Sequence, residues 1–176
     1  MKKQIFFWLL IIFCFSICVS QEFTPQIFLD RDFEVYLGLD VDEVKAFFSE
    51  SCLETEHIFS EEKPEYNTIF WDTNSGLRVS FYKGKRQIIS IVLTSDEYYI
   101  YYNGSRIIPF VTNLNDVINI LGEGTELYNE FRNVRVLEYG FKKKEYNPLI
   151  SDIIQIDFND DNVVERISIF DTSRFI

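Results

Sequence analysis

The sequence predicts an α+β fold made of two tandem repeats. In each repeat a helix precedes an antiparallel meander, and the strands form a sheet with the helices on one face. Two observations lead to this prediction. Each half of the chain carries a short segment with helical periodicity, followed by runs in which apolar and polar residues alternate. The triplet Ile-Ser-Ile also stands at matching places in the two halves, at residues 89–91 and 167–169. The same order of elements is therefore expected twice.

Both predicted helices show an apolar stripe and signals at their ends. Residues 41–48 and 114–121 carry apolar side chains at three- and four-residue steps, the spacing of one helix face. Short polar residues precede each stripe and a glycine follows the second, as is typical of helix caps. The residues expected at the helix ends are Asp40, Thr112 or Asn113, and Gly122.

The predicted strands follow each helix as runs of alternating or continuous apolar residues. Turns rich in Gly, Asn or Asp separate the last two strands of each half, at residues 83–84 and 159–162. This pattern indicates hairpins on either side of each turn. Strands are expected at residues 68–71, 77–81 and 88–93 in the first half, and at residues 134–141, 154–158 and 163–169 in the second.

A tyrosine-rich hairpin is expected between the two halves. Asn103-Gly104 between alternating residues is a strong signal for a two-residue turn. Side chains on a strand alternate between its faces, so two or three tyrosines are expected to be exposed if helices cover one face of the sheet. Tyrosine is enriched at protein interfaces, so exposed tyrosines here would indicate a binding site. The alternative is that these tyrosines are present because they favour strand formation and lie half-buried. The candidate partner-binding residues are Tyr98, Tyr99, Tyr101 and Tyr102.

The first twenty residues have the features of a secretory signal peptide. Two lysines precede an apolar stretch over residues 5–18, and Ser20 supplies the small residue before the expected cut. An uncleaved membrane anchor is one alternative, and a lipoprotein acylated at Cys18 is another. The expected organisation is a signal peptide over 1–20, a first α+β repeat over 21–95 and a second over 96–176, packed as one compact unit. The expected location is the periplasm, the cell envelope or the extracellular space.

Charge and cysteine content limit the expected partners. The chain has 17 Lys and Arg against 28 Asp and Glu, a net charge of −11. Removal of residues 1–20 takes two lysines and no acid, so the charge becomes −13 (−11 − 2). This balance argues against nucleic acid, whose phosphates require Lys and Arg. Cleavage after Ser20 would leave Cys52 as the sole cysteine, so no intrachain disulfide is expected.

Candidate residues for chemistry are few. Cys52 and His57 could in principle form a nucleophile and base, but catalytic pairs of this kind usually come from distant segments. Asp157, Asn159 and Asp161 have the alternate spacing of calcium ligands, and the alternative is that they form a hairpin turn. We expect no cofactor and no catalytic set. A carboxylate-dependent hydrolase remains an alternative, because acids are abundant.

The segment Val117-Ile-Asn-Ile-Leu-Gly-Glu-Gly124 resembles a helix ending found in small exported α+β modules. These include the outer-membrane-assembly lipoproteins of the BamE (SmpA/OmlA) type and the tandem-repeat β-lactamase inhibitory proteins. The sequence departs from their pattern: Gly124 stands where proline is usual, residues 44–50 lack the Leu-Gly pair, and no disulfide is expected. The resemblance implies a binding module rather than an enzyme.

The sequence therefore predicts an exported, non-enzymatic binding module that acts through an open sheet face, as an inhibitor or an envelope-assembly accessory. Its expected partner is another protein. A membrane is expected as a partner only if Cys18 is lipidated or the signal segment is retained. The alternatives are the hydrolase and a lipid-anchored structural protein of the envelope.

Overall fold

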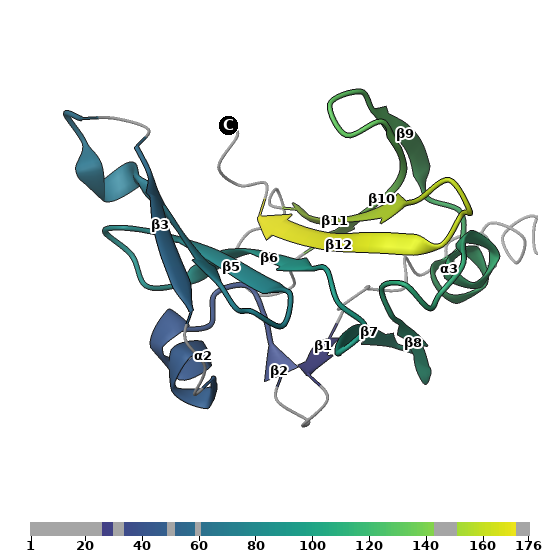
Figure 1. The fold of residues 1–176 in the computed structure, drawn as a ribbon, viewed down its shortest axis with the longest axis horizontal. Helices are drawn as coiled ribbons and strands as arrows, with labels where there is room; N and C mark the ends of the chain where they lie inside the picture. The colour runs from purple at the N-terminus through teal and green to yellow at the C-terminus, as the bar shows by residue number, and fades with distance from the viewer. Residues whose placement is uncertain (1–25, 30–33, 49–51, 59–60, 143–150, 172–176) are drawn as a thin grey trace, which may run out of the picture.

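The computed structural model describes residues 26–29, 34–48, 52–58, 61–142 and 151–171. Within these residues the chain forms twelve strands, two α-helices and one short 3-10 helix, η1, at Pro64–Tyr66. The strands make two antiparallel sheets, one of eight strands and one of four. Figure 1 shows the four-stranded sheet and both helices on the same side of the eight-stranded sheet.

The eight-stranded sheet, called the large sheet below, has the order β3-β4-β5-β6-β12-β11-β10-β9. Its two halves meet where β6 pairs with β12, with Ile91 opposite Ile169 and Leu93 opposite Ile167. The six strands predicted within the two halves of the chain all lie in this sheet. Its members are β3 (Leu53–His57), β4 (Thr68–Asp72), β5 (Leu77–Tyr82), β6 (Ile88–Leu93), β9 (Thr125–Asn129), β10 (Val134–Lys142), β11 (Ser151–Phe158) and β12 (Val164–Asp171).

The small sheet joins the start of the described chain to the tyrosine-rich hairpin. Its order is β2-β1-β7-β8, with β1 at Gln26–Leu29, β2 at Glu34–Val35, β7 at Tyr98–Tyr102 and β8 at Ser105–Ile107. The turn between β7 and β8 has positive φ at Asn103 (47°) and Gly104 (84°), as a two-residue hairpin turn requires. The predicted turn at Asn103-Gly104 is therefore confirmed.

The two helices are short and capped as the sequence predicts. α2 (Val41–Phe47) begins after Asp40, whose side chain accepts a hydrogen bond from the N–H of Asp42. α3 (Leu114–Leu121) begins after Asn113, whose side chain accepts from the N–H of Asp116. These bonds satisfy N–H groups that have no partner inside the helix.

The predicted α+β class, with two tandem helix-then-meander repeats, is wrong. The chain is mostly β: twelve strands accompany two helices of seven and eight residues, about two turns each. Helices of this length cannot cover an eight-stranded sheet, and the small sheet fills much of the space between them (Figure 1). Furthermore, β1 pairs with β7, so the small sheet draws strands from both sides of the predicted boundary at residues 95 and 96.

The hydrophobic core lies between the large sheet and the layer of helices and small sheet. Side chains that point to this layer alternate along each strand, which is the physical origin of the sequence pattern. Fully buried members of the core include Leu77, Ile88, Ile91, Leu93, Ile100, Ile107, Ile154, Ile156, Phe158, Ile167 and Ile169.

Gly124 allows the chain leaving α3 to pass close to Tyr139 on β10. The hydroxyl of Tyr139 donates to the carbonyl of Gly122 at 3.0 Å, and burial raises the pKa of this tyrosine to about 12. A Cβ atom at Gly124 would lie 2.8 Å from the Tyr139 ring. This contact explains why a residue without a side chain occupies position 124.

We expect Gly124→Ala to destabilise the protein by about 1–3 kcal/mol, the usual effect of overfilling a packed site. Chemical denaturation would measure the loss. Gly140→Ala is the matched control, because a Cβ atom at Gly140 meets nothing within 4 Å. An equal effect of the two substitutions would contradict the role given to Gly124.

Candidate functional site

The face of the large sheet that points away from the helices is covered by no described helix or strand (Figure 1). We call it the open face. Its side chains are the polar members of the alternating pattern, together with several apolar ones. The register aligns Arg78, Val92, Ser168 and Gln155 in one row across β5, β6, β12 and β11. A neighbouring row contains Arg166, Asp157, Val136 and Leu127 across β12, β11, β10 and β9.

Three arginines gather on the open face although the protein is strongly acidic. Arg78 forms an ion pair with Asp72 at 2.5 Å. Arg132, from the hairpin between β9 and β10, pairs with Asp157, and its Nη2 lies 3.5 Å from Glu165. These pairs fix the positions of two of the three guanidinium groups on the face.

Arg166, on β12, lies between the other two arginines. Its Nε donates to the Oγ of Ser168 at 3.0 Å, and among the described residues no carboxylate forms an ion pair with it. Burial lowers the pKa of Arg166, and the positive charges of Arg132 and Arg78 lower it further. The negative charge of Glu165 acts in the other direction and raises it. A carboxylate brought to this point would compensate the partly buried charge.

Beside the arginines lies an open hollow of about 380 Å³ at the β9 edge of the sheet. Apolar and aromatic side chains form much of its wall, and the chain that turns from β9 to β10 closes one end. Phe131, at this turn, is fully exposed. The residues that line the hollow are Leu127, Tyr128, Asn129, Glu130, Phe131, Val136 and Gln155.

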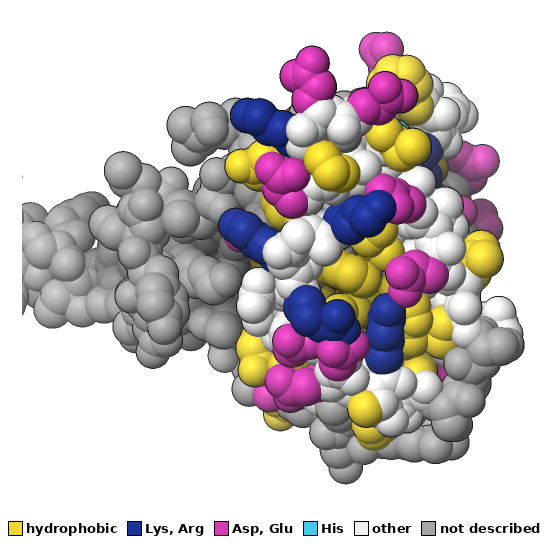
Figure 2. All heavy atoms as spheres, turned by 90° about the vertical axis from the view of Figure 1, so that its left-hand side faces the viewer, with side chains coloured by type: hydrophobic (Ala, Val, Ile, Leu, Met, Phe, Trp, Pro, Cys, Tyr) yellow, Lys and Arg dark blue, Asp and Glu magenta, His cyan; other side chains and the backbone are white. Residues whose placement is uncertain are grey.

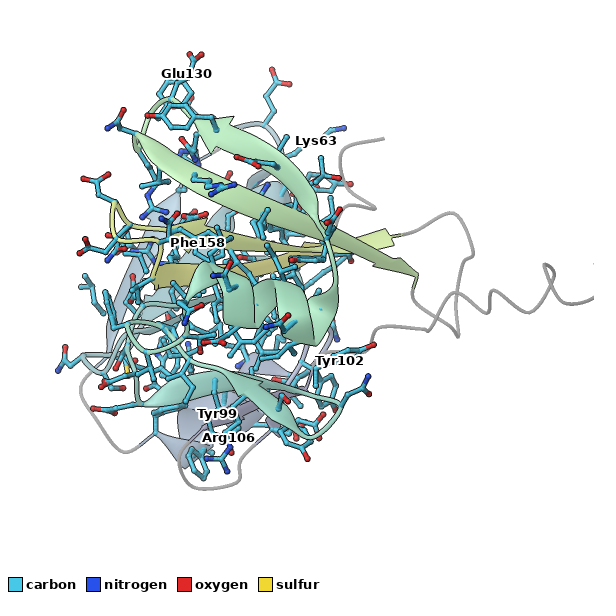
Figure 3. The ribbon with its side chains drawn as sticks, turned by 90° about the vertical axis from the view of Figure 1, so that its right-hand side faces the viewer. Lys63, Tyr99, Tyr102, Arg106, Glu130 and Phe158 are labelled. Atoms are coloured by element: carbon cyan, nitrogen blue, oxygen red, sulfur yellow. The ribbon has the colours of Figure 1, made fainter. Side chains whose placement is uncertain are left out.

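The turn that carries Phe131 is braced on both sides. The side chain of Asn129 accepts from the N–H of Arg132, and the hydroxyl of Tyr128 donates to the side chain of Asn133. Asn133 has a positive φ of 55°, a conformation that asparagine tolerates well. In Figure 3 this hairpin projects at the top of the molecule, where Glu130 is labelled. The exposed phenylalanine therefore stands on a fixed support.

Exposed apolar residues also occur at the other end of the molecule, near α2 and β3. Phe47, Leu53 and Tyr66 are exposed there. Figure 2 shows that the apolar side chains at this end are interspersed with both Lys or Arg and Asp or Glu. The hollow lies at the β9 end of the open face instead, which makes that end the better candidate.

The predicted tyrosine site lies in the small sheet and not on the open face. Tyr98 and Tyr99 are buried, whereas Tyr101 is 37% exposed and Tyr102 is partly exposed. Tyr98 shares a hydrogen bond with Ser75, and the guanidinium of Arg106 lies 4.4 Å from the centre of the Tyr99 ring (Figure 3). β7 is an inner strand between β1 and β8, so both of its edges are already paired with other strands.

The side chains of two of the three candidate calcium ligands, Asp157 and Asn159, have other roles in the structure. Asp157 is buried and pairs with Arg132. The Oδ1 of Asn159 accepts from the N–H groups of Asp161 and Val163 at 3.1 and 2.9 Å, which closes the turn between β11 and β12. In the described residues, no group of three His, Cys, Asp or Glu side chains lies close enough to hold a metal ion.

Cys52 and His57 are not brought together. Cys52 immediately precedes β3 and is partly buried, whereas His57 ends that strand and is exposed. Five residues of extended chain separate them by about 16 Å and place them on opposite faces. Cys18 and the whole predicted signal segment lie outside the described residues.

Sequence reasoning did not select Phe131, Arg132 or Arg166. One signal for Phe131 was present, because asparagines at 129 and 133 flank it and favour a turn. The arginines carried no such signal, because residues far apart in the sequence meet on the sheet only through strand register.

Comparison with protein-family models, with curated proteins and with solved structures finds no match to this chain. No helix in the described part of the chain is long and apolar enough to cross a membrane.

Proposed function

We propose that the protein is an exported, non-enzymatic binding module that recognises another protein through the open face of its large sheet. The observation that carries this proposal is Phe131, which is fully exposed on a braced turn beside an apolar hollow. Burial of one such aromatic side chain contributes about 1.5–3 kcal/mol to binding. A fixed turn also reduces the conformational entropy that binding would cost.

The arginines support the same proposal. Arg is enriched where protein interfaces concentrate their binding energy, and Arg166 lies on the same face as the hollow. The carboxylates of Asp72 and Asp157 are each held by an arginine. Glycoside hydrolysis needs two carboxyl groups that are available as acid and base or nucleophile. Carboxylates already paired with arginines fit a binding face better than such a catalytic pair. The inhibitor and envelope-assembly roles implied by the resemblance remain more specific predictions within this proposal.

The test is photo-cross-linking in cells that produce the protein. A photo-reactive phenylalanine analogue at position 131 is expected to give one adduct of defined mass, identified by mass spectrometry. The same analogue at position 36 is the control, because Tyr36 is also exposed (50%) but precedes α2 on the other side of the large sheet. Equal adducts at both positions, or none at position 131, would contradict the proposal.

With the cross-linked partner purified, Phe131→Ser should weaken its binding at least about 30-fold, the effect of losing a central aromatic contact. Tyr36→Ser should leave the affinity unchanged. The thermal stability of both variants should match that of the wild type, because both side chains are exposed.

A further inference from the structure

The large sheet ends in two edge strands, β3 and β9. Every side chain of β3 is exposed, as are those of β9 except for Asn129, which is partly exposed. In the described part of the chain, no strand pairs with the outer side of either one. Such an edge presents backbone N–H and C=O groups to which another strand can add. The two edges differ in whether they can accept a second copy of themselves.

The β3 edge opposes self-pairing. Two copies paired antiparallel about Thr55 would place Glu54 of one copy opposite Glu56 of the other. Pairing about either glutamate would place that residue opposite itself. Like charges directly opposite each other destabilise a strand pair. Both glutamates already pair with lysines, Glu54 with Lys45 at 2.6 Å and Glu56 with Lys83 at 2.8 Å, so charged side chains line this edge.

The β9 edge is self-complementary. Antiparallel pairing of two copies about Leu127 places Leu127 opposite its own copy, Tyr128 opposite Glu126, and Thr125 opposite Asn129. No like charges meet in this register. The carboxylate of Glu126 pairs with Arg135 at 2.9 Å within its own chain, and Tyr128, the residue opposite it in this register, carries no charge. Leu127 and Tyr128, which are 41% and 60% exposed, would each gain a neighbour.

The same register extends an apolar row across the pair. Val136 lies beside Leu127 on the open face, so the row would read Val136, Leu127, Leu127, Val136 across the two copies. The register also brings the turn that carries Phe131 alongside the segment that joins α3 to β9 in the other copy. A single interface would therefore cover part of the exposed apolar surface at Leu127, at Tyr128 and at the turn that carries Phe131.

We propose that two copies of the protein pair through β9 as a two-fold symmetric dimer, joining two eight-stranded sheets into one of sixteen strands. The two-fold axis is perpendicular to the sheet, because opposite residues in the register share a face. Both open faces then lie on the same side and form one continuous surface. The dimer shares Leu127 and Tyr128 with the hollow of the proposed partner site. Self-association of the purified protein and cross-linking to a different protein test the two proposals separately.

Sedimentation equilibrium of the purified protein tests the proposal. The wild type is expected to show a monomer–dimer equilibrium. Leu127→Lys would place two lysines opposite each other at the symmetry axis and should raise the dissociation constant at least about tenfold. Thr55→Lys is the matched control at the middle of the β3 edge and should leave the constant unchanged. Circular dichroism would confirm that both variants keep the fold.

Hydrogen exchange locates the interface. The amides of residues 125–129 should become protected as the protein concentration passes the dissociation constant, while those of residues 53–57 should not. A wild type that stays monomeric at millimolar concentration would overturn the proposal. So would a dimer that Leu127→Lys leaves intact, or concentration-dependent protection at β3 instead of β9.

Discussion

Phe158→Ala is expected to lower the free energy of unfolding by about 3–5 kcal/mol, the range found when a buried phenylalanine is truncated in a core. Phe158 is 1% exposed and is among the largest fully buried side chains of the described residues. It ends β11 and belongs to the core cluster between the large sheet and the layer that contains α3. The truncation removes its apolar contacts and leaves a cavity that the surrounding sheet and helix cannot close. Urea denaturation followed by circular dichroism would measure the loss.

Phe131→Ala is the control for this prediction, because it makes the same chemical change at a fully exposed position of the same half of the sheet. The expected change in stability is within about 0.5 kcal/mol. A comparable loss in both variants would mean that the described packing around Phe158 is incorrect.

Arg132→Leu is expected to destabilise the protein by about 2–4 kcal/mol, because it leaves the carboxylate of Asp157 without its partner. Breaking a buried pair from one side usually costs more than the pair contributes, since the remaining charge stays buried. The side chain of Asp157 is 6% exposed, whereas that of Arg132 is 31% exposed, so we place the effect below the upper end of the usual range. Thermal and urea denaturation at neutral pH would measure it.

Arg78→Leu is the matched control, because Arg78 pairs with Asp72 on the same face but both side chains are more exposed, at 47% and 25%. Its expected cost is below about 1 kcal/mol. Adding Asp157→Asn to Arg132→Leu should recover part of the lost stability by removing the unpaired charge. If Arg132→Leu costs no more than Arg78→Leu, the Arg132–Asp157 pair is not a buried contact.

The edge strands show why part of the fold escaped sequence reasoning. Inner strands such as β5 and β11 bury one face, so apolar and polar residues alternate along them. β3 and β9 expose both faces, and no alternating pattern marks them. The strands β1 and β2 are only four and two residues long, too short to give a periodic signal. The predicted α+β class was wrong because the sequence carries no signal for β1, β2, β3 and β9, so the strand content was underestimated.

The candidate site shows a second limit. Tyr98 and Tyr99 are strong strand formers, and the sequence predicted their strand and turn, yet the small sheet buries both. Arg78 and Arg166 are 88 residues apart (166 − 78), and they share a face only because β5, β6 and β12 are neighbours in a fixed register. Phe131 is prominent because nothing described packs over the turn between β9 and β10.

The sequence by itself determined the local elements of this protein: two capped helices, the inner strands and the hairpin turn at Asn103-Gly104. Periodicity, capping and turn geometry depend on neighbouring residues, so they can be read along the chain. The tertiary structure alone decided the mostly-β class, the burial of the tyrosines and the gathering of arginines and Phe131 at the open face. Alternation records that one face of a strand is buried, but it carries no information about which distant segment covers that face.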